Sequence, residues 1–181
     1  MIGRITKRVF HLIGWKLVGR FPHEVNHLIL IVAPHTSNWD FPLGILVKFW
    51  QKIEAKYYAK ASLFRWPLGV IMKYLGGRPV DRSKNQNIVT EAVEDFKNNM
   101  KHCVLITPEG TRKRTEKFKT GFYYIAVESG AGVLPITFDY ESKEIRIMPL
   151  MYMRGDGLSE VEEIRDLFKG IKGKNPQDGV F

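Results

Sequence analysis

The chain has 181 residues, 44% of them hydrophobic and 26% charged, which is the balance of one ordered globular domain. Its single cysteine, Cys103, excludes an intrachain disulfide and a zinc site made of several cysteines. The formal net charge of +9 indicates an anionic partner: nucleic acid, anionic lipid, or a phosphorylated or acidic substrate.

The N-terminal segment, residues 1–22, is predicted to form a basic amphipathic helix. Its apolar and basic residues fall on opposite helical faces: Ile2, Ile5, Val9, Leu12 and Ile13 on one, and Arg4, Lys7, Arg8 and His11 on the other. Trp15 and Phe21 follow as aromatic residues suited to a membrane interface. Such a helix can dock on an anionic membrane surface; the alternative is a first helix that packs its apolar face on the core.

No part of the sequence approaches the roughly 18 uninterrupted apolar residues that a membrane-spanning helix needs. His11, Lys16 and Arg20 interrupt the N-terminal apolar stretch, and no small-residue cleavage site follows it. We therefore expect no export signal and a cytoplasmic location.

Segments of strand and helix character alternate along the rest of the chain. Strands are predicted over residues 28–33, 55–61, 78–81, 102–107, 132–140 and 144–148, the last two as a hairpin. Helices are predicted over residues 40–53, 64–75, 85–100 (with Ser83 as N-cap), 120–129 and 159–168. This alternation predicts an α/β fold for residues 23–181: a single domain with a mixed, largely buried β-sheet flanked by helices.

Residues 34–40, with the sequence PHTSNWD, directly follow the first buried strand. His35 and Asp40 lie five positions apart, and an imidazole whose second nitrogen is held by a carboxylate can remove a proton from a hydroxyl group. The sequence contains no Gly-x-Ser-x-Gly motif, so this pair predicts direct attack by a substrate hydroxyl. The alternative is that Asp40 caps the next helix and His35 is a polar loop residue.

Two further segments carry basic and glycine residues after predicted turns or strands. Residues 76–82 read GGRPVDR, and residues 108–112 read PEGTR with a basic continuation to Lys119. Arginine side chains suit phosphate, and Gly110 lets backbone N–H groups approach an anion. Each segment alone is equally typical of a charged turn. A fourth segment, residues 133–136, places Pro135 early in a strand.

Taken in this order, the four segments resemble the motifs of the glycerolipid acyltransferases, which include the lysophosphatidate (1-acylglycerol-3-phosphate) acyltransferases. The resemblance covers residues 35–137 and implies that family's fold. It implies that His35 is the general base and that Asp40 orients it. It further implies that the acyl acceptor is bound by Arg82, Glu109, Gly110, Thr111, Arg112 and Lys119, while Pro135 belongs to the acyl side. Arg78 departs from the family pattern, which has an apolar residue there.

The resemblance implies an O-acyltransferase of phospholipid biosynthesis that moves a fatty acyl group from acyl-CoA or acyl carrier protein to the free hydroxyl of a lysophospholipid. The acceptor expected is 1-acylglycerol-3-phosphate, and the alternative is another lyso-lipid, such as one that contains an amino acid. No metal or other cofactor is expected, and an anionic membrane surface is expected to hold the protein peripherally. A basic nucleic-acid-binding α/β module is the other class consistent with the charge, but no nucleic-acid motif is recognisable, so no nucleic-acid partner is expected.

Overall fold

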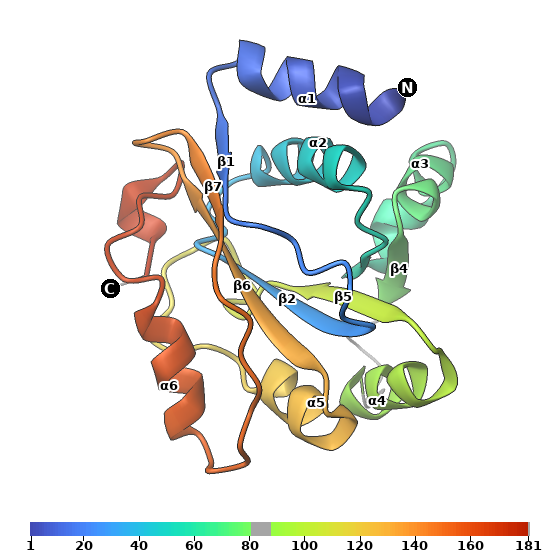
Figure 1. Ribbon diagram of the computed structural model, residues 1–181, viewed down its shortest axis with the longest axis vertical. Coiled ribbons are helices and arrows are strands. Elements are labelled where there is room, and N and C mark those ends of the chain that lie inside the picture. Colours follow the sequence, from blue (N-terminus) through green and yellow to red (C-terminus); the bar gives the residue numbers. More distant parts are fainter. Residues whose placement is uncertain (81–87, 181) are drawn as a thin grey trace.

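The computed structural model describes residues 1–80 and 88–180, which form one α/β domain around a mixed sheet (Figure 1). The strands are β1 (Lys16–Val18), β2 (His27–Ala33), β3 (Lys56–Lys60), β4 (Gly77–Val80), β5 (His102–Ile106), β6 (Gly132–Asp139) and β7 (Glu144–Ile147). The helices are α1 (Ile2–Leu12), α2 (Asp40–Gln51), α3 (Leu68–Tyr74), α4 (Ile88–Asn98), α5 (Gly121–Ser129) and α6 (Ser159–Asp166), with 3₁₀ turns η1 (Ala61–Phe64) and η2 (Pro176–Asp178). The predicted fold class is confirmed.

The described strands form one sheet in the order β1-β7-β6-β2-β5-β3-β4. Strand β2 pairs in parallel with β5 on one side and with β6 on the other, and β3 and β4 extend the parallel part. The predicted hairpin of β6 and β7 is the antiparallel pair. Because β2 and β5 are parallel neighbours, the loops that follow them leave the same edge of the sheet side by side.

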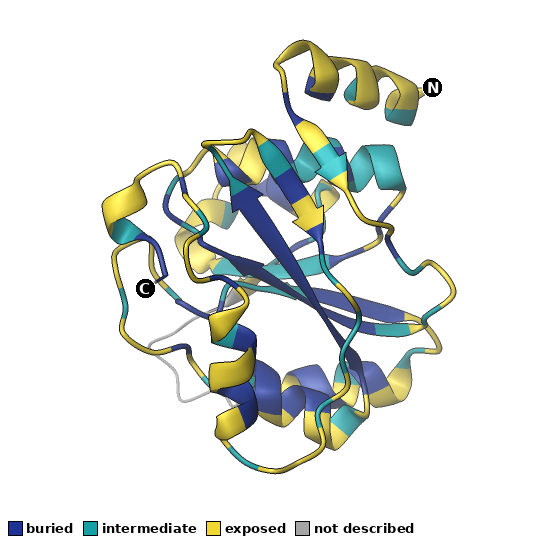
Figure 2. Cartoon of the chain, turned by 60° about the vertical axis from the view of Figure 1, so that its left-hand side comes forward, coloured by how far each residue is buried: buried dark blue, intermediate teal, exposed yellow. Residues whose placement is uncertain are grey.

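Helices cover both faces of the sheet, with α1 and α2 on one side and α4, α5 and α6 on the other (Figure 1). Alternate residues of β2 serve the two layers, as expected for a strand buried on both faces. Ile29 and Ile31 join the cluster formed with α4, α5 and α6. Leu28 and Leu30 join the cluster formed with α1 and α2. Figure 2 shows the central strands as the buried interior between these layers.

The N-terminal segment differs from the single helix predicted over residues 1–22. Helix α1 ends at Leu12, Gly14 turns the chain with φ +82°, and β1 then pairs in parallel with β7 at the sheet edge. Trp15 and Phe21, predicted at an interface, are instead buried in the core. Both rings belong to the core cluster on the α1–α2 side of the sheet. Burial there removes their apolar surface from water, which is more favourable than exposure.

Helix α1 packs on α2 around Gly3 and Phe10. A Cβ added to Gly3 would lie 3.0 Å from the carbonyl oxygen of Phe49, and Phe10 is fully buried. The predicted apolar face remains exposed, as the mostly exposed α1 in Figure 2 shows: Ile2, Ile5, Val9, Leu12 and Ile13. The predicted apolar face therefore does not pack on the core, although α1 itself contacts the core through Phe10.

Two other predicted helices change their limits. The one predicted over residues 64–75 is divided into η1 and α3, because Pro67 lacks the N–H that a continuous helix would use and serves as the N-cap of α3. In the helix predicted over residues 85–100, the described part is α4, and its predicted cap, Ser83, lies outside the described residues. None of the helices described has the length and apolar character needed to cross a bilayer.

Candidate active site

The 34–40 loop and the 107–120 loop meet at the carboxyl edge of the sheet, after β2 and β5 respectively. The backbone N–H of His35 donates a 2.7 Å hydrogen bond to Glu109 Oε2, which joins the two loops directly. The predicted motifs, 74 positions apart in sequence, are therefore in contact. This is the edge at which parallel α/β sheets place their ligands.

His35 and Asp40 form the pair that the sequence predicts. His35 Nδ1 lies 2.9 Å from Asp40 Oδ2, and the backbone N–H of Ser37 donates to the same oxygen at 3.1 Å. The Asp40 side chain is 3% exposed and that of His35 20% exposed. With Nδ1 held by the buried carboxylate, Nε2 is the ring nitrogen left to accept a proton from a bound hydroxyl group.

Tyr140, which no sequence motif indicated, completes the surroundings of Asp40. Its hydroxyl donates a 2.7 Å hydrogen bond to Asp40 Oδ1, from a position one residue beyond β6. Burial, and then this bond, raise the pKa of Tyr140, so the phenol keeps its proton and stays a donor at neutral pH. The ring of Trp15 packs edge-on against Tyr140, with centroids 4.9 Å apart.

Glu109 lies beneath the loops rather than on their surface. Glu109 is 4% exposed. Burial raises the pKa of its carboxyl group to about 7, although the hydrogen bond from the His35 backbone N–H acts in the opposite direction. This position gives Glu109 a structural task, holding the backbone of His35. Contact with an acyl acceptor stays a prediction for this residue.

The other predicted acceptor-binding residues divide into two groups. The Lys119 side chain runs across Gly110, where φ is +64° and an added Cβ would lie 2.6 Å from Lys119 Cε. Any other side chain at position 110 would displace that lysine. Thr111 and Arg112 are exposed at the tip of the loop. Arg82 lies outside the described residues.

The C-terminal segment 172–178 packs on the 34–40 loop, a contact that no sequence motif indicated. Asn175 donates from its backbone N–H to Thr36 Oγ1 at 3.2 Å and from Nδ2 to the Thr36 carbonyl oxygen at 2.9 Å. A Cβ on Gly173 would lie 2.5 Å from Thr36 Oγ1. Lys174 Nζ lies 4.6 Å from the Trp39 ring centroid. The loop that carries His35 is thus held from both sides.

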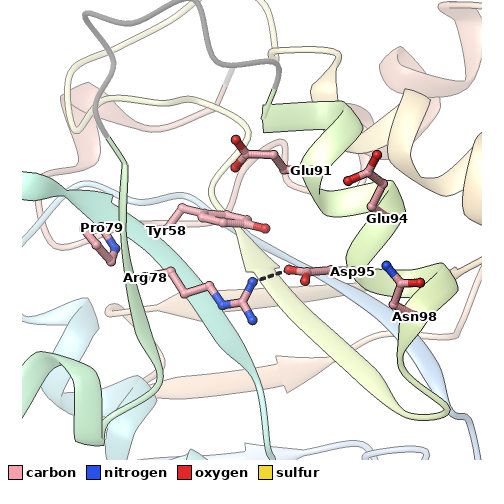
Figure 3. A pocket seen from close by; sticks show the side chains of 7 residues that line it. All are labelled: Tyr58, Arg78, Pro79, Glu91, Glu94, Asp95 and Asn98. Carbon is pink, nitrogen blue, oxygen red and sulfur yellow. Dashed lines mark hydrogen bonds and ion pairs between the residues drawn. The ribbon is translucent and has the colours of Figure 1, made fainter.

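Arg78, which departs from the family pattern, forms an ion pair with Asp95 and so joins β4 to α4 (Figure 3). His102 Nε2 lies 3.9 Å from the same carboxylate, and burial lowers the pKa of His102. This ion pair is in a pocket of about 380 Å³, apart from His35, that is lined by Tyr58, Arg78, Pro79, Glu91, Glu94, Asp95 and Asn98. Arg78 therefore has a structural partner away from the predicted chemistry.

Cys103 is excluded as a nucleophile by its surroundings. The side chain is buried on β5, and burial raises the pKa of its thiol to about 12. Only the thiolate is a good nucleophile, so the thiol is inert at neutral pH. Cys103 therefore supplies no nucleophile to the candidate site.

Comparisons with known proteins assign this arrangement to a family. The family model described as Acyltransferase matches residues 16–139, which contain both loops and the strands that position them. The chain belongs to the acyltransferase family. A 1-acyl-sn-glycerol-3-phosphate acyltransferase from Escherichia coli (strain K12) is 25% identical over 154 residues, which are 80% of this chain and 61% of that protein. The chain thus spans less than two thirds of the length of this relative.

A crystal structure of the 1-acyl-sn-glycerophosphate (LPA) acyltransferase from Thermotoga maritima has the same fold as this acyltransferase chain. The two superpose with a TM-score of 0.61, covering 92% of this chain and 75% of the other, at 20% sequence identity. The family model begins at Lys16, the first residue of β1, so α1 lies before the matched region.

Proposed function

We propose that the chain transfers a fatty acyl group from an acyl thioester to the free hydroxyl group of a lysophospholipid, with 1-acylglycerol-3-phosphate as the acceptor. The observation that carries the proposal is the His35–Asp40 pair, with Nδ1 and Oδ2 2.9 Å apart, beside the Glu109–Lys119 segment at the carboxyl edge of β2 and β5. Family membership and the names of the two relatives support it.

In the proposed reaction, His35 Nε2 takes the proton of the acceptor hydroxyl as the oxygen attacks the thioester carbonyl carbon. Asp40 accepts a hydrogen bond from Nδ1–H, fixes the tautomer and stabilises the imidazolium that forms. The tetrahedral intermediate then expels the thiolate of coenzyme A or of an acyl carrier protein, and the imidazolium protonates it. The products are an ester and a free thiol, and the step uses no metal ion or other cofactor.

Acceptor recognition is assigned to the cations near the site. Lys119 lies across Gly110, and Arg112 extends from the same loop into solvent, so both can approach a charged head group held next to His35. Phosphate matches these side chains by charge, and arginine matches it by geometry. The predicted contribution of Arg82 belongs to the same set.

The deciding experiment is incubation with labelled acyl-CoA or acyl carrier protein and a panel of lyso-lipids, followed by identification of the product by mass spectrometry. We expect acylated 1-acylglycerol-3-phosphate with wild type and none with His35→Ala. If only an amino-acid-containing lyso-lipid is acylated, the proposed reaction stands but the acceptor is that lipid and not 1-acylglycerol-3-phosphate. Failure with every lyso-lipid and both donors would refute the proposed function.

A lipid acceptor requires access to a membrane, and α1 is the proposed docking element for an anionic, cytoplasmic surface. Its exposed apolar side chains, named above, are left free by the packing through Gly3 and Phe10. Each Lys or Arg near anionic lipid contributes about 1 kcal/mol, and inserted hydrocarbon contributes about 0.8 kcal/mol per CH₂. The helix supplies both contributions at once.

Replacing Arg4, Lys7 and Arg8 together with Gln tests this docking. We expect the partition coefficient on anionic liposomes to fall by up to about a hundredfold, because about 3 kcal/mol of electrostatic attraction is removed. Wild-type binding should also weaken as salt rises, since screening acts over about 8 Å at physiological ionic strength. Flotation at two salt concentrations measures both effects.

A matched control variant replaces three other exposed lysines with Gln: Lys97, Lys101 and Lys169. It lowers the net charge by the same amount as the α1 variant. If the control variant loses as much binding as the α1 variant, total charge rather than α1 governs the association. Activity on a detergent-dispersed acceptor should survive in both variants, because neither set of residues contacts the His35 site.

A further inference from the structure

The segment from η1 through α3 exposes an unusual concentration of apolar side chains. Trp66 is 87% exposed, and the rest of the group is between 40% and 73% exposed. We call this group the η1–α3 surface, and it consists of Leu63, Trp66, Leu68, Val70, Ile71 and Tyr74. Single exposed apolar residues are ordinary on proteins, whereas a cluster of this size marks an interaction surface.

The packing of α3 explains why these side chains remain outside. Gly69 and Met72 face the domain and are buried. A Cβ at Gly69 would lie 2.1 Å from the carbonyl oxygen of Phe64, so the helix lies directly on η1 at that point. The other apolar residues of α3 are exposed.

The chain segment that carries the η1–α3 surface is basic. Residues 55–80 contain no Asp or Glu, and their basic residues are Lys56, Lys60, Arg65, Lys73 and Arg78. Of these, Lys60, Arg65 and Lys73 are exposed and lie within or next to the surface. Apolar and aromatic side chains among lysine and arginine are the composition that binds an anionic lipid interface.

The η1–α3 surface is connected to both α1 and the candidate active site. The Phe49 and Tyr74 rings have centroids 6.5 Å apart, and Phe49 also supplies the carbonyl oxygen against Gly3 of α1. In Figure 1, α3 accordingly lies beside the N-terminal end of α1. Toward the site, the Tyr57 hydroxyl donates a 3.3 Å hydrogen bond to the Met72 carbonyl oxygen of α3. The Tyr57 ring centroid lies 5.5 Å from that of Phe41, which directly follows Asp40.

We infer that the η1–α3 surface is a second membrane-binding surface, which inserts Trp66, Val70 and Ile71 into an anionic leaflet beside α1. The inference rests on the proposed function for its choice of a lipid partner. Two separate contacts fix the orientation of the domain on the bilayer, whereas α1 alone leaves it free to rotate about one helix. The carboxyl edge of β2 and β5, where His35 and Glu109 lie, is thereby held toward the leaflet.

The first test replaces Trp66, Val70 and Ile71 together with Ser and measures flotation with vesicles of phosphatidylcholine and phosphatidylglycerol. We expect at least about a tenfold lower partition coefficient, because three inserting side chains are removed. The control variant Met100→Ser/Tyr152→Ser removes two exposed apolar side chains distant from α3 and should bind as wild type. Equal flotation of wild type and the triple variant would overturn the inference.

The second test uses Trp66 as a reporter. Wild type added to the same vesicles containing brominated acyl chains should show quenched tryptophan emission. The Trp66→Phe variant retains an apolar ring, so it should still float while losing most of the quenching. If quenching persists undiminished in Trp66→Phe, another tryptophan is the one inserted and the surface has been wrongly assigned.

Failure of this inference and failure of the proposed function give different results. Vesicle binding is measured without substrate, so it can succeed even when no lyso-lipid is acylated. Conversely, wild type can acylate a lyso-lipid while the triple variant floats normally. That result would support the proposed function and overturn the inference about the η1–α3 surface. If the triple variant floats normally but abolishes a wild-type dimer in analytical ultracentrifugation, the surface binds a second copy of the chain, which also overturns the inference.

Discussion

The two loops that meet at the carboxyl edge of the sheet are held in opposite ways. The 34–40 loop is fixed by contacts from three distant parts of the chain: Glu109, Tyr140 and Asn175. The 107–120 loop is fixed near Glu109 and at the backbone N–H of Arg114, which donates to Asp178 Oδ1 at 3.4 Å, but the side chain of Arg112 is exposed.

The difference matches what each loop is proposed to do. Proton transfer needs the base and its carboxylate partner in place before the substrate arrives, because small displacements cost rate. Recognition of an anionic head group by long cationic side chains tolerates movement, since the charges can adjust to the ligand. Changes in the 34–40 loop should therefore lower kcat, and changes in the exposed cations should raise the acceptor KM.

The largest expected effect comes from His35→Ala. Removal of a general base costs roughly 10²–10⁴-fold in rate, so we expect kcat to fall by that factor while the domain stays folded. Asp40→Asn should lose a similar amount, because the imidazole loses its tautomer and orientation. Steady-state kinetics with circular dichroism as the folding control measure this. Near-normal turnover by folded His35→Ala would show that the 34–40 loop does not supply the general base.

Glu109→Gln tests the contact between the two loops through the pH dependence of stability. The pKa of Glu109 is about 7 in the folded chain, against an ordinary value of 4.5. For a group whose pKa is raised by folding, the stabilising contribution is full below pH 4.5 and is lost as pH rises through about 7. A pKa increase of this size changes the free energy of unfolding by on the order of 3 kcal/mol across this pH range.

We therefore expect urea unfolding to show wild type losing stability relative to Glu109→Gln between pH 5 and pH 8. Gln carries no charge in this range and can still accept the hydrogen bond from the His35 backbone N–H. A stability difference that stays constant over this range, or that changes in the opposite direction, would show that Glu109 is not a buried carboxyl group with a raised pKa.

The sequence predicted the position of the 34–40 loop but not the distant residues that hold it. The apolar run Leu28–Ala33 and the residues 108–112 were sufficient to place two strands and their loops, because parallel neighbours bring their carboxyl ends together. Tyr140 and Asn175 lie 100 and 139 positions from their partners, Asp40 and Thr36. Those contacts depend on the register of β6 and on the path of the C-terminal segment, which no local pattern encodes.

The edges of the fold show the same limit. Lys16–Val18 has only three residues, so β1 could not be distinguished from a continuation of the N-terminal helix until its pairing with β7 was seen. Residues 64–75 were predicted as a single helix, yet Leu68, Val70 and Ile71 of α3 are exposed. Periodicity identifies an apolar face but does not tell whether the domain or a partner covers it.

Tyr140→Phe tests how far the fixed loop depends on its distant supports. The change removes the hydrogen bond to Asp40 Oδ1 and keeps the ring packed on Trp15. A hydrogen bond to a charged group contributes about 1.5–3 kcal/mol, so we expect kcat to fall by about tenfold or more with little change in the acceptor KM. Tyr152→Phe, at an exposed tyrosine, is the control and should be neutral. Unchanged kcat in Tyr140→Phe would show that Ser37 and His35 suffice to hold Asp40.

The smallest expected effect, and the sharpest contrast with the 34–40 loop, comes from Arg112→Ala. Loss of one charge-assisted hydrogen bond in an exposed setting should raise the acceptor KM about tenfold and leave kcat nearly unchanged. Arg112→Lys should recover part of the affinity, because the charge remains while the bidentate geometry is lost. Kinetics with the acceptor and then the donor varied separate the two substrates. If Arg112→Ala leaves acceptor use unchanged and raises the donor KM instead, the exposed loop binds the phosphates of coenzyme A or an acidic carrier protein, and the acceptor must be held elsewhere.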